Sequence, residues 1–494
     1  MKRLFVNAGI LAWENDSFHY IENGCLGVDG DTICYIDADR PAENYDDVRD
    51  MTGRLLMPGL INCHCHNGMT LLRGVGSDLP LQEWLFDKMI PVEDRMTAED
   101  IAAGNELAMM ELIASGVTSF SDMYMEAQTA IASNERIGMK MNVCRVVQSF
   151  DPNERVEDCF RIPESIELFE KYNGAQNGRV RIDFAVHAEY TATTHIIRAY
   201  ADRCRPYIEK GARMQIHLSE TQKEHRECIE RHGMTPAEGF LDTGIFDVPT
   251  GAAHCVAVTP RDMEILKEKG VSPIHNPTSN LKLGSGFAPI PEMLDMGINV
   301  ALGTDGAASN NNLNMFEEMH LAAIMHNGYR NDAVIMKPEQ VLKMATVNGA
   351  KLQGRDDTGC LEVGKKADII AIDFRKPHLY PNFEPMALLV YSAQASDVCM
   401  TMVDGKILYE DGKFLTLDPE TVMNNARAAV KRLYGEAESW REQTRALHSC
   451  CNMKTSPGTI PARCAFSIAA CIRAGWSSSP AAPIRRSPRP SPTW

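Results

Sequence analysis

The spacing of His64 and His66 is the first sign of chemistry in the sequence. Both follow the apolar run 57–61, whose length and Pro-Gly pair predict a short buried strand. Side chains at positions i and i+2 share one face of a strand, so the two imidazoles can present nitrogens to the same metal ion. Such a centre needs three or four protein ligands, and the others must therefore come from elsewhere in the chain.

Three later segments have the same form, an apolar run that ends in a possible ligand. They end at His217, His254 and Asp305. With His64 and His66, the first and last of these would provide three nitrogens and one oxygen. This set leaves a position for a water molecule, whose pKa the cation lowers towards about 7. The residue types therefore predict one metal centre for hydrolysis.

His254 has two possible roles beside that centre. It can bind a second metal, or it can hold the attacking water by a hydrogen bond. Two-metal barrel hydrolases usually have a bridging acidic group, and the fourth predicted strand is followed by His187 instead. We therefore favour a single metal, with His254 next to it as a hydrogen-bonding group.

Glu220 follows His217 by three residues, just beyond a predicted strand end. This spacing can bring its carboxylate back over the metal, where it could carry a proton between water and a leaving group. The alternative is a solvated glutamate at a helix start, as expected for Glu224 and Glu227. The neighbouring histidine favours the catalytic interpretation.

Three cysteines adjoin the candidate ligands, namely Cys63, Cys65 and Cys255. Alternation along a strand points them away from the metal and towards the outer side of the strands. Buried cysteines commonly act as small apolar groups, so we expect packing rather than ligation.

The segments that carry these residues alternate between strand-like and helix-like patterns. Eight short apolar runs can be placed: the run before His64, then 117–120, 139–147, 179–186, 213–218, 250–256, 271–274 and 298–302. Repeated strand-then-helix order favours a parallel (β/α)8 TIM barrel, although a doubly wound sheet has the same pattern. In a barrel, chemistry belongs at the carboxyl ends of the strands, where the candidate ligands stand.

The two chain ends differ from this middle part. Residues 1–56 and 359–420 carry short strands with Asn-Gly and Asp-Gly turn signals, which predict one composite β-sandwich domain built from both ends. The hydrolase barrel would span 57–358. A helix is expected over 421–447, and the Pro-, Ser- and Arg-rich tail 448–494 predicts disorder.

Composition limits the possible partners. The chain has 494 residues and a formal charge of −16, which argues against nucleic acid as the main partner. The sequence has no run of the roughly 18 to 20 apolar residues that span a membrane, and no secretory signal precedes its 15 scattered cysteines. A reducing, cytoplasmic location is therefore expected. Formation of a homo-oligomer is left open.

A set of motifs resembles the amidohydrolase superfamily over roughly residues 1–440. They are PGLINCHCH at 58–66, MTLLRG at 69–74, EWL at 83–85, HLSE at 217–220, AHC at 253–255, HNPTSNLKLG at 275–284 and LGTDGAASNN at 302–311. Within the superfamily they are most similar to the 5-methylthioadenosine/S-adenosylhomocysteine deaminases. The resemblance does not cover the tail.

The resemblance implies a (β/α)8 barrel with one Zn²⁺, or alternatively Fe²⁺. The ligands that it implies are His64, His66, His217 and Asp305. The implied reaction is hydrolytic attack at C6 of an adenine ring, which releases ammonia. In it Glu220 protonates the ring, Asp305 accepts a proton from water, and His254 orients that water.

The resemblance also implies contacts to a nucleoside. Glu93 matches a ribose-binding carboxylate, His187 a nucleoside-contacting histidine and Trp84 a pocket aromatic. Arg145 matches an arginine that binds the carboxylate of a homocysteinyl tail, and Arg155 is a candidate for a second one. The expected substrates are adenosine, 5′-deoxyadenosine, methylthioadenosine and S-adenosylhomocysteine.

Other functions remain as alternatives. Guanine or pterin deaminases and triazine hydrolases use the same metal chemistry, and Glu93 favours a nucleoside over them. A cytidine-deaminase-type enzyme lacks support, because no Pro-Cys-x-x-Cys follows His187-Ala188-Glu189. A non-catalytic scaffold would be expected to have lost its ligands, and here all of the candidates are present.

Overall fold

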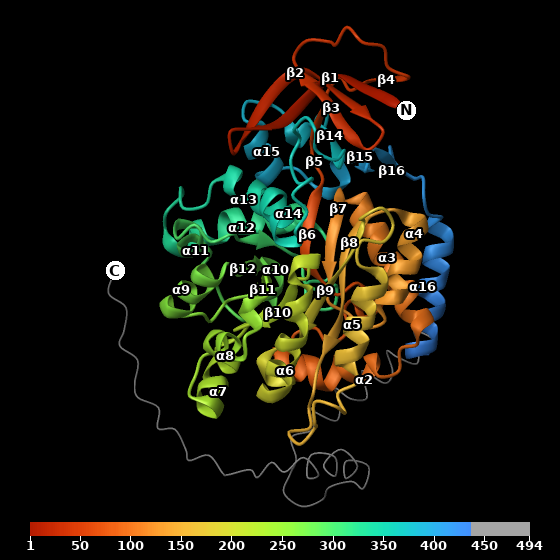
Figure 1. The fold of residues 1–494 in the computed structure, drawn as a ribbon. Helices are drawn as coiled ribbons and strands as arrows, with labels where there is room; N and C mark the ends of the chain where they lie inside the picture. Colours follow the sequence, from red (N-terminus) through yellow and green to blue (C-terminus); the bar gives the residue numbers. More distant parts are fainter. Residues whose placement is uncertain (436–494) are drawn as a thin grey trace, which may run out of the picture. The chain divides into compact units, whose positions relative to one another are not determined.

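A computed structural model describes residues 1–435 of the 494-residue chain. Residues Met1–Leu433 form one compact unit. Within the described residues the strands form two sheets, one made of the middle of the chain and one made of both ends. Figure 1 shows the second sheet at one end of the helix-covered barrel.

The middle sheet contains eight parallel strands in sequence order. They are β6 (Leu60–Cys65), β7 (Val117–Asp122), β8 (Lys140–Val147), β9 (Val180–Val186), β10 (Met214–Leu218), β11 (Thr250–His254), β12 (Ser272–His275) and β13 (Ala301–Leu302). The barrel closes where the segment after β13 meets β6. There the Asp305 N–H donates a hydrogen bond to the His64 carbonyl at 2.9 Å. The predicted (β/α)8 barrel is confirmed, and the doubly wound alternative is wrong.

Helices cover the outside of the barrel (Figure 1). The main ones are α3 (Ala98–Ala114), α4 (Ala127–Ile137), α5 (Arg161–Tyr172), α6 (Thr194–Cys204), α7 (Gln222–His232), α8 (Pro236–Thr243), α9 (Pro260–Lys269), α10 (Pro277–Lys282), α11 (Ile290–Asp295), α12 (Met315–Arg330), α13 (Pro338–Ala345) and α14 (Val347–Gln353). Their apolar faces and the outward-facing strand residues share one core, to which Leu112, Phe184 and Phe316 belong. Burial of this apolar surface holds each helix on the barrel.

The second sheet combines the two chain ends, as predicted. Its nine strands are β1 (Lys2–Glu14), β2 (Ser17–Asp29), β3 (Thr32–Asp37), β4 (Asp47–Asp50), β5 (Arg54–Pro58), β14 (Ile369–Asp373), β15 (Val398–Val403), β16 (Lys406–Glu410) and β17 (Lys413–Phe414). The ends join where β5 pairs antiparallel with β14. Residues such as Phe5, Leu26 and Ile369 form its own apolar core.

The boundary between sheet and barrel falls inside the run 57–66. Met57 and Pro58 end β5 and pair with β14, whereas the barrel strand begins at Leu60. Gly59 makes the change of sheet possible: a Cβ atom at this position would lie 2.1 Å from the Thr118 hydroxyl oxygen. The single strand expected over this run is therefore two strands in two sheets.

The described chain ends on α16 (Pro419–Tyr434), at the start of the helix predicted over 421–447. The rest of that prediction, from residue 436, and the predicted tail 448–494 lie outside the described residues. Among residues 1–435, no helix combines the length and apolar character needed to cross a bilayer.

Candidate active site

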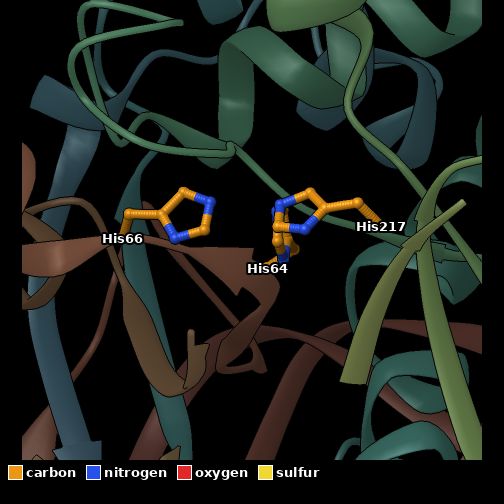
Figure 2. Close-up of side chains that lie close together, drawn as sticks. All are labelled: His64, His66 and His217. Carbon is orange, nitrogen blue, oxygen red and sulfur yellow. The ribbon is translucent and has the colours of Figure 1, made fainter. Parts of the chain in front are cut away.

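Three histidines converge at the carboxyl end of the barrel. His64 lies on β6, His66 follows that strand, and His217 lies on β10. Figure 2 shows His66 and His217 approaching from opposite sides, with His64 between them. One ring nitrogen from each lies within 4.8 Å of the others. Residues 153 positions apart in sequence thus form one group of possible metal ligands.

Hydrogen bonds on the far side of two rings determine which nitrogen faces the cluster. His66 Nδ1 is 2.6 Å from the Met123 carbonyl oxygen, and His217 Nδ1 is 2.7 Å from the His187 carbonyl oxygen. A carbonyl can only accept, so each Nδ1 carries the donated proton and each Nε2 is directed inward. His64 Nε2 is buried without a hydrogen-bond partner. This arrangement of inward nitrogens fits a metal ion.

Asp305 supplies the fourth group. Its Oδ1 lies 3.2 Å from His66 Nε2 and 3.5 Å from His64 Nε2. Its Oδ2 accepts hydrogen bonds from the hydroxyls of Ser279 and Ser309, each at 2.6 Å. The two serines orient the carboxylate, leaving the other oxygen directed at the histidines.

The pKa values in this cluster show how strongly Asp305 interacts with the neighbouring histidines. Burial lowers the pKa of His64 to about 4. At His66, burial also opposes charge, but Asp305 outweighs it and raises the pKa to about 9. Burial acts to raise the pKa of Asp305, yet the adjacent rings of His64 and His66 hold it well below its ordinary value. Asp305 is therefore an ionised carboxylate at neutral pH, the form that binds a metal cation.

Glu220 and His254 lie beside the cluster. The Glu220 side chain is buried, and its Oε2 is 3.8 Å from His254 Nε2. Burial raises the pKa of Glu220 above its ordinary value, which favours a carboxyl group that can hold a proton as well as release it. His254 Nδ1 is 2.8 Å from Asn280 Oδ1, so His254 Nε2 also faces inward. His254 additionally groups with His64 and Asp305 as a possible metal-binding set.

The strand-end turns are strained where they carry these groups. His254 has a φ of 73° and Asp305 a φ of 62°, and Ser219, next to Glu220, has a φ of 46°. Side chains other than glycine rarely adopt this left-handed region, and such residues concentrate at functional sites. The turns direct the polar groups back over the barrel axis.

A cavity of about 290 Å³ opens over the cluster. Four of the five predicted substrate contacts line it: Trp84, Glu93, Arg145 and His187. Trp84 begins a single-turn π-helix, 84–89, and its indole Nε1 is buried without a partner. Burial raises the pKa of Glu93, whose Oε1 accepts a hydrogen bond of 2.8 Å from the Tyr124 hydroxyl. Burial also lowers the pKa of His187 to about 3, so this ring is neutral.

The fifth predicted contact, Arg155, does not line this cavity. Its side chain is 70% exposed and forms two hydrogen bonds with Asp158, three residues along the chain. A different arginine, Arg161 at the start of α5, lines the cavity together with Arg145. The local sequence does not distinguish Arg161 from Arg155 as a cavity residue, because only the path of the loop before α5 brings Arg161 inward.

Sequence reasoning also missed three supporting residues. Ser279 and Ser309 lie inside the quoted motifs, and the position of Ser309 four residues after Asp305 was a usable signal. Glu224, expected to be solvated, is only 3% exposed. Burial and the neighbouring carboxylates of Glu220 and Glu189 raise the pKa of Glu224 to about 8.

The three neighbouring cysteines are placed as predicted. Cys63 packs in an apolar cluster with residues of β12, β13 and α14, and Cys65 and Cys255 belong to the main barrel core. Burial raises the pKa of the Cys63 and Cys255 thiols well above the ordinary value. All three therefore remain neutral, apolar packing groups.

The Amidohydrolase family model matches residues 55–408, which span the barrel and the following strands β14 and β15 of the second sheet. The chain belongs to the amidohydrolase family. The predicted resemblance is thereby confirmed.

Two relatives are similar to this amidohydrolase over most of its length. A 5-methylthioadenosine/S-adenosylhomocysteine deaminase from Acetivibrio thermocellus is 44% identical, over 88% of this chain and all of the relative. A 5′-deoxyadenosine deaminase from Methanosarcina mazei is 40% identical, over 88% of this chain and 98% of the relative. Family and relatives confirm the expected class, a hydrolase acting on carbon–nitrogen bonds.

A solved structure also matches. An adenosine deaminase from Xanthomonas campestris with bound zinc superposes with a TM-score of 0.80 at 30% identity, covering 87% of this chain and 98% of the other. A triazine hydrolase has a TM-score of 0.81 at 22% identity, a likeness that concerns the fold alone.

Proposed function

We propose that this amidohydrolase hydrolyses the 6-amino group of an adenosine derivative, releasing ammonia and the corresponding inosine derivative. The supporting observation is that one cavity contains both parts of such a site. Glu220 and His254 lie at the histidine cluster, and Glu93 lines the same cavity. A purine ring over the cluster would bring its ribose hydroxyls towards Glu93, a hydrogen-bond acceptor.

The proposed metal ligands are His64, His66, His217 and Asp305. Zn²⁺ suits three imidazoles and one carboxylate, and Fe²⁺ accepts the same donors. A bound ion would supply the Lewis acidity that makes water a nucleophile at neutral pH.

The chain's own residues would move the protons. Asp305 accepts a proton from the attacking water, and the inward Nε2 of His254 accepts a hydrogen bond from the same water, which orients it at C6. Glu220 protonates N1 of the ring as the C6–O bond forms. The Glu220 carboxylate then takes up the proton of the new C6 hydroxyl, which becomes the carbonyl, while the proton held by Asp305 passes to the amino group, so that the C6–N bond breaks and ammonia leaves. The raised pKa of Glu220 suits both steps, because the group must give and take protons.

The outer part of the cavity would recognise the 5′ substituent. Arg145 lines it and donates through Nε to Glu164 Oε2 at 2.8 Å, and Arg161 lines it as well. A pair of guanidinium groups is well suited to the carboxylate of a homocysteinyl tail. We therefore place S-adenosylhomocysteine among the proposed substrates, with methylthioadenosine, 5′-deoxyadenosine and adenosine. Since the eleven described cysteines are free thiols, we propose a reducing, cytoplasmic location.

The test is ammonia release from a substrate panel with metal content measured in parallel. The panel holds the four adenosine derivatives, guanine, a pterin and a chlorotriazine, with chloride release measured for the last. We expect selective turnover of adenosine derivatives by the metal-loaded protein. Preferred turnover of guanine, the pterin or the chlorotriazine would contradict the proposal.

Glu220→Gln is the matched variant for the proton-transfer role. The amide keeps the shape of the side chain but cannot transfer protons. We expect full metal content and a kcat lower by about 10²- to 10⁴-fold. Loss of the metal, or near-normal turnover, would contradict the role of Glu220.

A further inference from the structure

The turn that carries Glu220 depends on an unusual backbone conformation. The chain leaves β10 at Leu218, and Ser219 then adopts the left-handed conformation with a φ of 46°. A serine in this region is strained and persists only where surrounding contacts hold it. The direction of the Glu220 side chain therefore depends on whatever fixes this turn.

The contacts that fix it converge on one side chain. The Ser219 N–H donates to Glu224 Oε1 at 3.1 Å, and the Glu220 N–H donates to Glu224 Oε2 at 2.7 Å. Successive N–H groups around a left-handed residue form a concave site for an anion. Here the concave site holds a carboxyl group of the same chain, and both hydrogen bonds are charge-assisted above its pKa of about 8.

Glu224 is itself held firmly. It lies in the first turn of α7, its own N–H donates to Thr221 Oγ1 at 3.1 Å, and its side chain is buried. The turn is tied on its other side to the segment after β11. The Cys255 N–H donates to the Leu218 carbonyl at 3.0 Å, and the Ala257 N–H donates to the Ser219 carbonyl at 2.8 Å. The Glu220 turn is thus clamped between Glu224 and the His254 segment.

Comparison with other helices separates this arrangement from an ordinary helix cap. In the pairs Thr97–Asp100, Thr235–Glu238 and Thr259–Asp262, the acidic side chain accepts from the N–H of its own N-cap threonine. Thr221–Glu224 has the same spacing, but its carboxylate bonds the two residues before the N-cap. Glu224 therefore supports the active-site turn in place of closing a capping box.

We propose that Glu224 is a positioning residue for the reaction, which holds the Ser219–Glu220 backbone so that the Glu220 carboxyl stays beside His254 and the metal-binding histidines. Glu224 does not touch the substrate and acts through Glu220. The inference rests on the proposed deaminase function for its kinetic consequences, whereas its structural consequence can be measured without any substrate.

The test compares Glu224→Gln with Glu238→Gln, which changes a true capping box on the next helix. Assays run at about pH 9, above the pKa of Glu224, on the best substrate of the panel. In Glu224→Gln an amide N–H₂ must face a backbone N–H, so one hydrogen bond is lost. We expect kcat to fall at least tenfold, with KM within about threefold and metal content unchanged. Glu238→Gln should keep kcat within about twofold.

Amide hydrogen exchange gives the second readout. Ser219 and Glu220 should exchange at least tenfold faster in Glu224→Gln and at the wild-type rate in Glu238→Gln. Glu224→Asp, whose shorter side chain reaches the turn less well, should fall between wild type and Glu224→Gln in both measurements.

Two results would overturn the inference: a kcat for Glu224→Gln within twofold of wild type, or unchanged exchange at residues 219 and 220. If the wild type deaminates none of the adenosine derivatives, the proposed function fails. The exchange result then still decides the role of Glu224 in holding the turn.

Discussion

The interior of the barrel contains two layers of buried polar residues with different roles. The upper layer lies at the carboxyl ends of the strands, and the lower layer lies before it along the same strands. In the lower layer, Asp183 of β9 accepts hydrogen bonds from Asn142 of β8 at 3.0 Å and from Gln215 of β10 at 2.8 Å. In the upper layer, His217 stands two residues beyond Gln215 on the same strand, and its Nε2 faces other imidazole nitrogens.

The difference shows how one scaffold separates stability from chemistry. In the lower layer the amide groups of Asn142 and Gln215 both donate to the Asp183 carboxylate, so these side chains fill the barrel and link adjacent strands, while the amide oxygens of Asn142 and Gln215 have no partner within residues 1–435. Side chains of the upper layer direct nitrogen and oxygen atoms at a common point, where a bound ligand would interact with them. Polar burial by itself does not mark a functional site; several ligand atoms that converge on one point do.

The largest expected effect comes from a change of aspartate to asparagine in the upper layer. Asp305→Asn removes a negative ligand and keeps the shape of the side chain. We expect a loss of metal affinity together with a fall in kcat/KM on the order of 10³-fold, because a lost charge costs several kcal/mol at such a site. Metal analysis and steady-state kinetics check this.

Ser309→Ala, which only removes an orienting hydroxyl, should lower metal affinity by about 10- to 100-fold.

Arg161→Ala tests recognition at the outer part of the same cavity. Loss of a charged hydrogen-bond donor should raise KM for S-adenosylhomocysteine by about 10- to 100-fold, equivalent to roughly 1.5–3 kcal/mol. KM for methylthioadenosine, which has no carboxylate, should stay within about twofold. Arg155→Ala is the control, since its side chain is exposed and paired with Asp158. Equal effects of the Arg161 change on both substrates would contradict carboxylate recognition.

Asp183→Asn makes the matching change in the lower layer. An amide there would place N–H₂ against the donors of Asn142 and Gln215, leaving buried donors unsatisfied. We expect the free energy of unfolding to fall by about 1–3 kcal/mol, with metal content and kcat near wild type. Denaturant unfolding and kinetics check both parts. A large loss of kcat in a folded, metal-loaded variant would break the distinction between the layers.

The smallest expected effect on activity concerns a carboxyl outside both layers, which acts on stability. Glu318 of α12 accepts from Asn310 Nδ2 at 2.6 Å and from the Thr278 N–H at 3.1 Å. Burial raises its pKa from 4.5 to about 8. The unfolded chain releases this proton near pH 4.5 and the folded chain near pH 8, so the group's contribution to stability falls as pH rises between these values.

Unfolding free energies measured between pH 5 and 8 test this linkage. The contribution of Glu318 has a slope of up to about 1.4 kcal/mol per pH unit. Glu318→Gln, which cannot titrate, should lose that slope, and Glu317→Gln on the same helix should keep it. Equal slopes in wild type and Glu318→Gln would contradict the raised pKa.

The sequence by itself determined the features that follow from local periodicity. Alternation along single strands predicted that His64 and His66 share a face and that Cys63 and Cys65 point the other way, and the structure shows both. Repeated strand-then-helix order predicted the barrel, which then brings strand ends from distant segments to one point.

Only the tertiary structure decided the features that depend on what surrounds a residue. The chain passes from one sheet to the other at Gly59, where Thr118 of the neighbouring strand leaves no room for a side chain. Arg161 reaches the cavity and Arg155 does not, since the path of a loop is not encoded in its spacing. The sequence does not distinguish Glu224 from more exposed glutamates nearby such as Glu227. Its carboxyl group is nevertheless buried and accepts hydrogen bonds from two backbone N–H groups of a strained turn. Periodicity specifies which face a side chain occupies, whereas burial and hydrogen-bond partners arise from contacts between distant segments.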